Sequence, residues 1–324
     1  MTRFLALLVV SICAASQAVA QTPGRPFSQR PITIVLAFPP GASADTTMRM
    51  VTNRVTEQTG QAFVIKNMAG GAGIVAATAV RRAPADGLTL LQATLTTMAT
   101  NQFLAEEKPY DLVADFRPVT KLWSLPLLAM TSSTNGVKSL RDLVDLARRK
   151  PGGLSYSSTG VHTVPHFLGA LLAVESGAPM VHVPYSGASQ AIFDLIANRL
   201  DLYFVSYASV ISFMRNGELR ALAVGERKRM TALPDVPTTA EAGYPGVVLP
   251  AHWGLLAPAG TPDESIGLLN EMFVRALRDP ALLKATAEQG TEIVDTTPRE
   301  FGDMVEAEFI SLQRVLKATG MEKK

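Results

Sequence analysis

The sequence predicts an α/β fold made of two lobes. The chain has 324 residues, which is more than one compact unit of common size needs. With 47% apolar and 18% charged residues, its composition is that of a globular protein. Short apolar runs alternate with helical patterns in both halves, and such alternation produces parallel strands joined by helical crossovers. Together these three observations indicate the fold class.

The charge of the chain argues against one class of partner. The formal net charge is +2, which is too small to indicate nucleic acid, and no basic stretch is interleaved with aromatic residues. The two dense basic runs, 148–150 and 227–229, are short and typical of solvated helix or strand ends. We therefore expect no nucleic-acid partner.

The first twenty residues have the pattern of a secretory signal peptide. Arg3 precedes an apolar run at 4–12, and Ala18-Val19-Ala20 forms a cleavage site that predicts cutting after Ala20. The single cysteine, Cys13, would be the acylated residue of a lipoprotein, but Ile12 before it is not the small residue that such a site requires. We expect a mature protein in the periplasm that contains no disulfide.

The stretch from Pro31 to Gly60 predicts a strand, a turn and a helix. A short apolar run rich in β-branched residues is formed by Ile32, Ile34, Val35 and Leu36. Pro39-Pro40-Gly41 ends the strand, and Gly60 ends the helix. Ser43 and Asp45 are the expected N-cap residues, and Met48, Val51 and Val55 form the apolar face of the helix. A helix that starts directly after a central strand directs free N–H groups at the sheet edge, which is a ready anion site.

The rest of the first half continues this alternation. Strands are expected at 62–66 and 88–93, with a flexible loop at 67–73 and a helix at 74–82 between them. Small hydrogen-bonding residues follow the third strand, where open α/β sheets bind ligands: Thr94, Thr96, Thr97 and Asn101. A looped stretch at 109–119 then leads to a strand at 125–130.

The second half repeats the order of strand, polar loop and helix. Ser139 is expected to cap a helix whose apolar face contains Leu140, Leu143, Val144 and Ala147. Further helices are expected at 166–177, 190–197, 263–278 and 298–319. Further strands are expected at 154–157, 181–185, 202–205, 219–224 and 253–258.

Four polar segments follow strands, and most of them open helices: 39–45, 94–101, 157–163 and 185–189. This arrangement suits a small anion held between two lobes by N–H groups and hydroxyls. It contains no evident reactive group. The chain has no G-x-S-x-G motif around Ser43, Ser157 or Ser186, so the sequence does not indicate an enzyme.

Two motifs suggest a cofactor or a metal, and both have simpler explanations. Gly71 to Ala76 matches G-x-G-x-x-A, but the strand before it ends near Lys66 and the next strand tip carries no acid, so we expect no dinucleotide cofactor. His162 and His166 lie four residues apart, but Pro165 interrupts a helix through both, so we expect no metal.

His182 and Tyr185 lie in or next to the strand expected at 181–185. His182 lies in an apolar strand and is expected to be a hydrogen-bonded core residue. Tyr185 could either contact a ligand or pack at a strand end.

Several segments in order along the mature chain resemble the Bug-type receptors, which are the extracytoplasmic solute-binding proteins of tripartite tricarboxylate transporters. The likeness is carried by residues 30–35 with Phe38-Pro39-Pro40-Gly41 and Asp45, and by the segments 83–87, 109–111, 115–119, 183–187, 220–224, 233–238 and 254–262.

The resemblance implies a two-lobed Venus flytrap of periplasmic-binding-protein type II with mixed central sheets. Lobe 1 would comprise residues 21–125 and 251–324, and lobe 2 residues 126–250. A small carboxylate would lie between the lobes, with loop 39–45 at one end and loops 157–163 and 185–189 at the other. The implied partners are the permease subunits in the membrane, and a monomer is expected.

Ligand contacts are expected from both lobes. From lobe 1 they are Phe38, Pro40, Gly41, Ser43, Asp45, Thr94, Thr96 and Asn101. From lobe 2 they are Ser157, Thr159, His162, Thr163, Tyr185, Gly187 and Val205.

The chain departs from the family pattern at several of these positions. Ala42 replaces a second glycine, His162 stands where glycine is common, and Val205 stands where aspartate is common. Asn67-Met68-Ala69 replaces the usual Asn-Arg-Pro. The loss of an acid at 205 favours a dicarboxylate, a tricarboxylate or an aromatic acid over an amino acid. Two other functions stay open: an exported sensor for a membrane kinase, and a hydrolase or dehydrogenase that uses the same loops.

Overall fold

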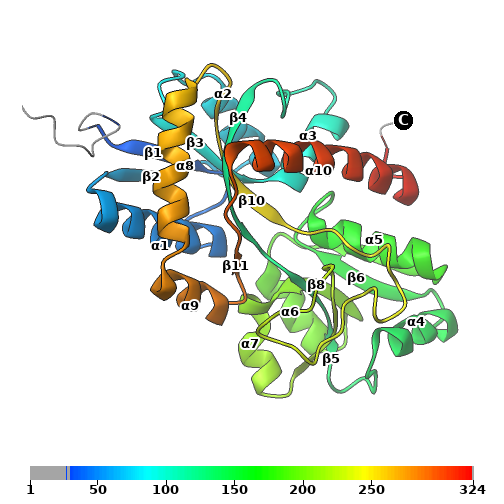
Figure 1. Cartoon of the computed structure of the whole chain (residues 1–324). Coiled ribbons are helices and arrows are strands. Elements are labelled where there is room, and N and C mark those ends of the chain that lie inside the picture. Colours follow the sequence, from blue (N-terminus) through cyan, green and yellow to red (C-terminus); the bar gives the residue numbers. More distant parts are fainter. Residues whose placement is uncertain (1–26, 28–29, 323–324) are drawn as a thin grey trace, which may run out of the picture.

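The computed structural model describes residue 27 and residues 30–322, so the predicted signal peptide lies outside the described residues. It contains two β-sheets, each covered by helices, which form the cores of two lobes (Figure 1). None of the helices within these ranges has the length and apolarity that crossing a bilayer requires.

The first sheet is mixed and has six strands in the order β11-β4-β10-β3-β1-β2. Its strands are β1 (Ile32–Leu36), β2 (Phe63–Asn67), β3 (Thr89–Thr94), β4 (Phe116–Ser124), β10 (His252–Pro258) and β11 (Glu292–Ile293). β1 is parallel to both β2 and β3, whereas β10 is antiparallel to β3 and β4.

Helices cover both faces of this sheet. One face is buried by α1 (Ser43–Thr59) and α8 (Asp263–Leu277), whose Met48, Val51 and Leu269 pack with Ile34 of β1. The other face is buried by α2 (Ile74–Arg81), α3 (Leu95–Leu104) and α10 (Pro298–Thr319). The 3₁₀ turn η1 (Gly71–Gly73) precedes α2, and α9 (Pro280–Glu288) follows α8.

The second sheet has five strands in the order β7-β6-β8-β5-β9. Its strands are β5 (Leu127–Ser132), β6 (Leu154–Ser158), β7 (Met180–Pro184), β8 (Leu202–Ser206) and β9 (Leu219–Val224). The helices α4 (Leu140–Arg149) and α5 (Val164–Ser176) lie on one face, and α6 (Ala188–Ile196) and α7 (Tyr207–Arg215) on the other.

The chain passes between the sheets twice, and the two passages lie side by side. β4 leads into β5 across Leu125, and the segment after β9 returns to β10 across Ala251. The backbone N–H of Leu125 donates to the carbonyl of Ala251 at 3.1 Å. This paired crossing is the natural place for one lobe to turn against the other.

The register shows which strand ends face the other lobe. β10 starts at the crossing and pairs Trp253 with Thr94, so the carboxyl end of β3 lies there, and so do those of its parallel neighbours β1 and β2. In the second sheet β5 starts at the crossing and pairs Leu127 with Ser206, so β8, β6 and β7 also end on this side. We call these strand ends, with the loops 37–42, 159–163 and 185–187, the interlobe face.

The C-terminal helix α10 joins the two lobes, because it packs on β4 and α3 of the first lobe and on α5 of the second (Figure 1). Phe301 of α10 lies against Gly254 of β10, where a Cβ would stand 1.9 Å from the Phe301 ring. One hydrophobic cluster therefore runs through both lobes.

Most predicted elements are confirmed, and several are corrected. The bounds of β9 and α10 are as predicted, and the buried residues of α4 are the four predicted ones. The predicted polar loop 94–101 is wrong, because it is mostly α3, in which Leu95, Met98 and Ala99 are buried at helical spacing. The predicted loop 109–119 already contains the start of β4 at Phe116, and the strand predicted at 125–130 begins only at Leu127.

Candidate functional site

Helix starts dominate the interlobe face. Among the described residues, six helices follow the carboxyl ends of parallel strands, and none of the six has a side-chain cap: α1, α2, α3, α5, α6 and α7. In the same part of the chain α4, α9 and α10 have side-chain caps, and none of them follows such a strand end. α8 also lacks a side-chain cap, but it follows the antiparallel strand β10. Uncapped N–H groups and positive dipole ends therefore meet between the lobes, which favours a bound anion.

The loop before α1 is held by a buried carboxylate. Asp45 accepts hydrogen bonds from the backbone N–H of Gly41 at 3.0 Å, from Arg49 Nε at 3.1 Å and from Asn67 Nδ2 at 3.0 Å. The Arg49 hydrogen bond, with those from Gly41 and Asn67, lowers the pKa of Asp45 to about 2. Asn67 also donates to the carbonyl of Phe38 at 3.0 Å.

These contacts correct the predicted N-cap of α1. The N-cap is Ala42, and no side chain caps it. The oxygens of Asp45 accept hydrogen bonds from the loop before α1, from Arg49 and from Asn67, and Ser43 does not act as the cap. Asn67, which was expected at the start of the loop 67–73, is the last residue of β2 and ties this turn to that strand.

Aromatic residues surround the base of this loop. The ring centroid of Phe38 lies 4.7 Å from that of Trp253, and Trp253 stacks on Trp123 at 6.1 Å. Gln92 is fully buried beside them in the sheet, and neither polar atom of its amide has a hydrogen-bond partner in the described structure. The indole nitrogen of Trp253 is unpartnered in the same sense.

The three predicted contacts after β3 have different environments. Thr94 lies at the strand end and its hydroxyl donates to Thr97 at 2.9 Å. Thr96 is fully buried and donates to Glu308 of α10. Asn101 donates to the carbonyl of Ala72 at 2.9 Å, so its amide supports η1. Of the three, Thr94 is the residue at the interlobe face.

The loop after β6 is held by its own side chains. Ser158 Oγ donates to the carbonyl of Gly160 at 2.7 Å, and Thr163 Oγ1 donates to the same carbonyl at 2.8 Å. Ser157 is fully buried, and its hydroxyl has no hydrogen-bond partner in the described part of the chain. Thr159 is exposed, and His162 is half-buried with a φ of +62°.

The remaining predicted contacts belong to the second lobe: Tyr185 follows β7, Gly187 precedes α6, and Val205 lies in β8. The hydroxyl of Tyr185 donates to Asp194 at 2.7 Å, and burial with this bond raises the pKa of Tyr185 to about 12. Gly187 is the N-cap residue of α6. Val205 is buried in the core with Leu128, its partner in β5, while the next residue, Ser206, lies at the strand end.

A cluster of buried ionisable side chains, which was not predicted from the sequence, lies beside the crossing. Burial lowers the pKa of Lys121 in β4 to about 8, and burial together with Glu292 raises the pKa of Glu226, after β9, to about 7. Glu308 is buried in α10, and burial lowers the pKa of His252 to about 4. A charge inside an apolar strand, as in VTKLW at 119–123, was the available signal.

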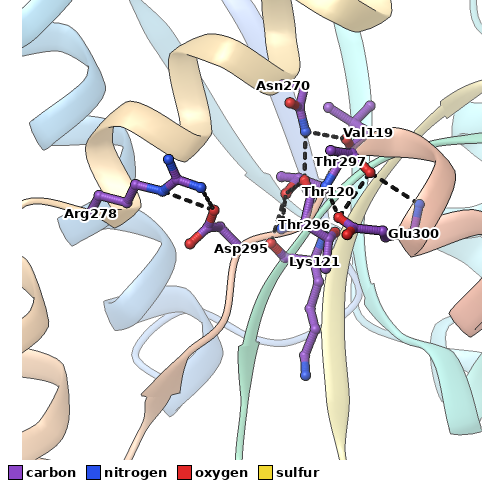
Figure 2. Close-up of polar contacts among 9 residues, drawn as sticks. All are labelled: Val119, Thr120, Lys121, Asn270, Arg278, Asp295, Thr296, Thr297 and Glu300. Carbon is purple, nitrogen blue, oxygen red and sulfur yellow. Dashed lines mark hydrogen bonds and ion pairs between the residues drawn. The ribbon is translucent and has the colours of Figure 1, made fainter.

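The strand that carries Lys121 is fixed by polar contacts (Figure 2). Asn270 of α8 donates to the carbonyls of Val119 at 2.9 Å and Thr296 at 2.8 Å, and Thr296 Oγ1 accepts from the backbone N–H of Lys121 at 3.0 Å. Figure 2 shows the Lys121 side chain extending away from this network. The backbone of Lys121 is thus held in place, while its ammonium group lies outside this network.

A cavity between the lobes lies away from the predicted loops. It has a volume of about 730 Å³ and is formed by residues 228–232 of the second lobe and by residues of α9 and β11, between Leu283 and Val294, of the first. β9 and β11 each lie at one edge of their sheet. None of the predicted contact residues lines it.

Comparison with known proteins identifies the family. The model of the tripartite tricarboxylate transporter family receptor matches residues 47–321. The chain belongs to this family.

Among the receptor's relatives, BugT of Bordetella pertussis is 31% identical over 325 residues, covering 100% of this chain and 99% of BugT. The structure of R. palustris Rpa4515 with adipate has a TM-score of 0.82 and 32% identity, covering 91% of this chain and 98% of the other. MatC from Rhodopseudomonas palustris with bound malate has a TM-score of 0.78 and 28% identity, covering 90% of this chain and 100% of MatC.

Proposed function

We propose that this receptor binds a small di- or tricarboxylate, or an aromatic carboxylate, between its two lobes in the periplasm. It then delivers the ligand to the membrane subunits of a tripartite tricarboxylate-type transporter. The observation that carries the proposal is the meeting of six uncapped helix starts at the interlobe face. The adipate and malate bound by two relatives support the ligand class.

The proposed lobes are residues 21–125 with 251–324, and residues 126–250, and the receptor works as a monomer. Contacts from the first lobe come from Phe38, Pro40, Gly41, Ser43 and Thr94, with Asp45 in support. Contacts from the second come from Thr159, His162, Thr163, Tyr185 and Gly187, with Ser157 beneath the loop.

Binding in this proposal needs no bond chemistry. A ligand that touches both lobes stabilises the arrangement in which they are close, because only that arrangement makes both sets of contacts. The paired crossing at Leu125 and Ala251 allows the lobes to turn, and the ligand leaves unchanged. Recovery of chemically unaltered ligand after long incubation with the receptor checks this point.

A ligand panel tests the proposal. Adipate, malate, citrate and benzoate are compared with leucine, aspartate and glucose by thermal shift and titration calorimetry on the purified mature protein. A ligand present at 100 times its Kd adds about 2.7 kcal/mol of stability, which gives a clear rise in Tm. Binding confined to amino acids or glucose would overturn the proposal.

Gly187 offers a matched test of the helix starts. It is the N-cap of α6 with a φ of −170°, and a Cβ there would meet nothing within 4 Å, so other residues fit. Gly187→Asp gives α6 the carboxylate that the ligand would otherwise supply. We expect unchanged or higher stability with affinity at least about tenfold lower.

Two controls complete this test. Gly187→Asn caps the helix without charge and is expected to lower affinity much less. Thr297→Asp makes a similar change at the start of α10, which already has a side-chain cap, and is expected to leave affinity unchanged. Equal affinity in Gly187→Asp and wild type would remove α6 from the site.

A further inference from the structure

Three histidines gather beside the start of α5. The ring centroids of His166 and His182 lie 3.8 Å apart, and those of His162 and His166 lie 6.0 Å apart. In the described residues no group of three or more His, Cys, Asp or Glu side chains is arranged to hold a metal ion. The cluster therefore needs another explanation than metal binding.

Hydrogen bonds assign the protons of two of the three rings. His166 Nδ1 accepts from the backbone N–H of His162 at 2.9 Å, so the proton of neutral His166 is on Nε2. Ser158 Oγ donates to Gly160 and lies 2.7 Å from His182 Nε2, so His182 donates through Nε2. Protonation of His166 at Nδ1 would break the bond that shapes the loop.

For His162, no hydrogen bond in the described structure assigns the ring proton. Its imidazole has no hydrogen-bond partner within the described residues, and the residue is half-buried in the loop 159–163 of the interlobe face. Its φ of +62° is costly for a residue with a Cβ. A strained backbone that presents a free imidazole at a binding surface is a candidate functional feature.

Among residues 27 and 30–322, no carboxylate forms an ion pair or a hydrogen bond with these three histidines. The titratable side chain whose ring packs against His166 and His182 is Tyr156 on β6. On α10 the buried acid is Glu308, bonded by Thr96, and on α6 Asp194 is bonded by Tyr185 and Arg199. Burial lowers the pKa of all three histidines, and the charges that lower the pKa of His166 and His182 further are those of the neighbouring histidines.

We propose that His162 selects for a multiply charged ligand by taking up a proton on binding, so that its imidazolium pairs with one ligand carboxylate. This inference rests on the proposed function. The ligand supplies the negative charge that the surroundings of His162 lack, and a charge-assisted hydrogen bond favours the protonated ring. A monocarboxylate whose single charged group is bound by the first lobe has no second carboxylate to pair with the His162 imidazolium.

Proton uptake on binding makes affinity rise as pH falls. His162 is mostly neutral above its lowered pKa in the empty receptor and charged in the complex. Each proton taken up changes affinity by up to a factor of about ten per pH unit. Between pH 6.5 and 8.0 aliphatic dicarboxylates stay doubly ionised, so the change reports on the protein.

The test measures adipate binding, and malate binding if adipate gives no heat, by calorimetry at pH 6.5 and 8.0. At each pH, two buffers of different ionisation enthalpy give the number of protons taken up. We expect wild-type affinity about tenfold higher at pH 6.5, with net proton uptake. Asparagine tolerates positive φ and does not titrate. The affinity of His162→Asn for the same ligand is therefore expected to differ by less than about twofold between pH 6.5 and pH 8.0.

His182→Asn is the matched control, since it removes a neighbouring imidazole and leaves His162. It is expected to keep the pH dependence. Loss of the dependence in His182→Asn but not in His162→Asn, or wild-type binding without proton uptake, would overturn the inference while leaving carboxylate binding intact. Absence of any carboxylate binding to wild type at both pH values would overturn the proposed function and the inference together.

Discussion

The Asp45 carboxylate accepts a hydrogen bond from the backbone N–H of Gly41, four residues before it, at 3.0 Å. The same side chain accepts bonds from Arg49 in the next turn of α1 and from Asn67 at the end of β2. One buried carboxylate therefore joins the turn, the helix and the neighbouring strand.

Asp45→Ala is expected to lower the free energy of unfolding by about 2 kcal/mol, because it removes the hydrogen bonds that Gly41, Arg49 and Asn67 donate to the buried carboxylate. The pKa of about 2 lies below the unfolded value of 3.8, so the stabilisation is complete above about pH 4. It is lost as pH falls towards 2. Urea unfolding at pH 7 and pH 3 measures both effects.

Asp145 provides the control for this change, since it forms an exposed pair with Arg148 on α4. Asp145→Ala is expected to change stability by less than about 0.5 kcal/mol.

The affinity of Asp45→Ala for the carboxylate ligand should also be lower than that of wild type. Unchanged affinity would show that this turn supports the fold without shaping the site.

Gln92→Met is expected to raise stability by about 1 kcal/mol. The native amide is fully buried with neither polar atom bonded, and methionine fills a similar volume without polar atoms. Gln61→Met is the control, because the Gln61 amide donates to the carbonyls of Arg30 and Ala62. Gln61→Met should lower the free energy of unfolding. Equal losses of stability in Gln92→Met and Gln61→Met would mean that the Gln92 amide also has hydrogen-bond partners.

Glu226→Gln is expected to change how stability depends on pH. The pKa of Glu226 in the folded protein is about 7, above its ordinary value of 4.5, because of burial and the nearby Glu292. Its favourable contribution is present below pH 4.5 and is lost as pH rises through 7.

Wild type should therefore lose about 2 kcal/mol relative to Glu226→Gln between pH 5 and pH 8. Chemical denaturation across that range measures the difference. Parallel pH curves for the two proteins would contradict the assignment. Glu241→Gln, which removes an exposed partner of Arg229, serves as the control and should not change the curve between pH 5 and 8.

Gly254→Ala is expected to destabilise the protein by about 3 kcal/mol, because its Cβ would overlap the Phe301 ring. Gly267→Ala on α8 is the control. No atom lies within 4 Å of a Cβ there, and alanine favours the helix by about 1 kcal/mol. Equal Tm values for the two variants would contradict the close packing of α10 on β10.

Local signals in the sequence predicted much of this fold. Ser139 and Asp142 form the capping box of α4, and Gly60 ends α1 with a φ of +73°. Such features depend on residues a few positions apart, so they can be inferred without the tertiary structure.

Features that depend on distant residues could not be predicted this way. Thr96 and Asn101 suggested a polar loop, but Thr96 bonds Glu308, 212 positions later, and Asn101 supports η1. The register of β8 against β5 buries Val205, which no short pattern reveals. The buried group around Lys121 and Glu226 forms only because the chain crosses twice at one place.

The missing side-chain caps on the interlobe face have a consequence for the empty receptor. Six helices present the same sign of partial charge to one region. Closing the lobes without a ligand would bring these partial positive charges near one another, which is unfavourable. In the proposed function, the bound anion is therefore the counterion that allows the lobes to close. A membrane partner that recognises the closed shape would then meet loaded receptors and pass over empty ones, without needing any other signal.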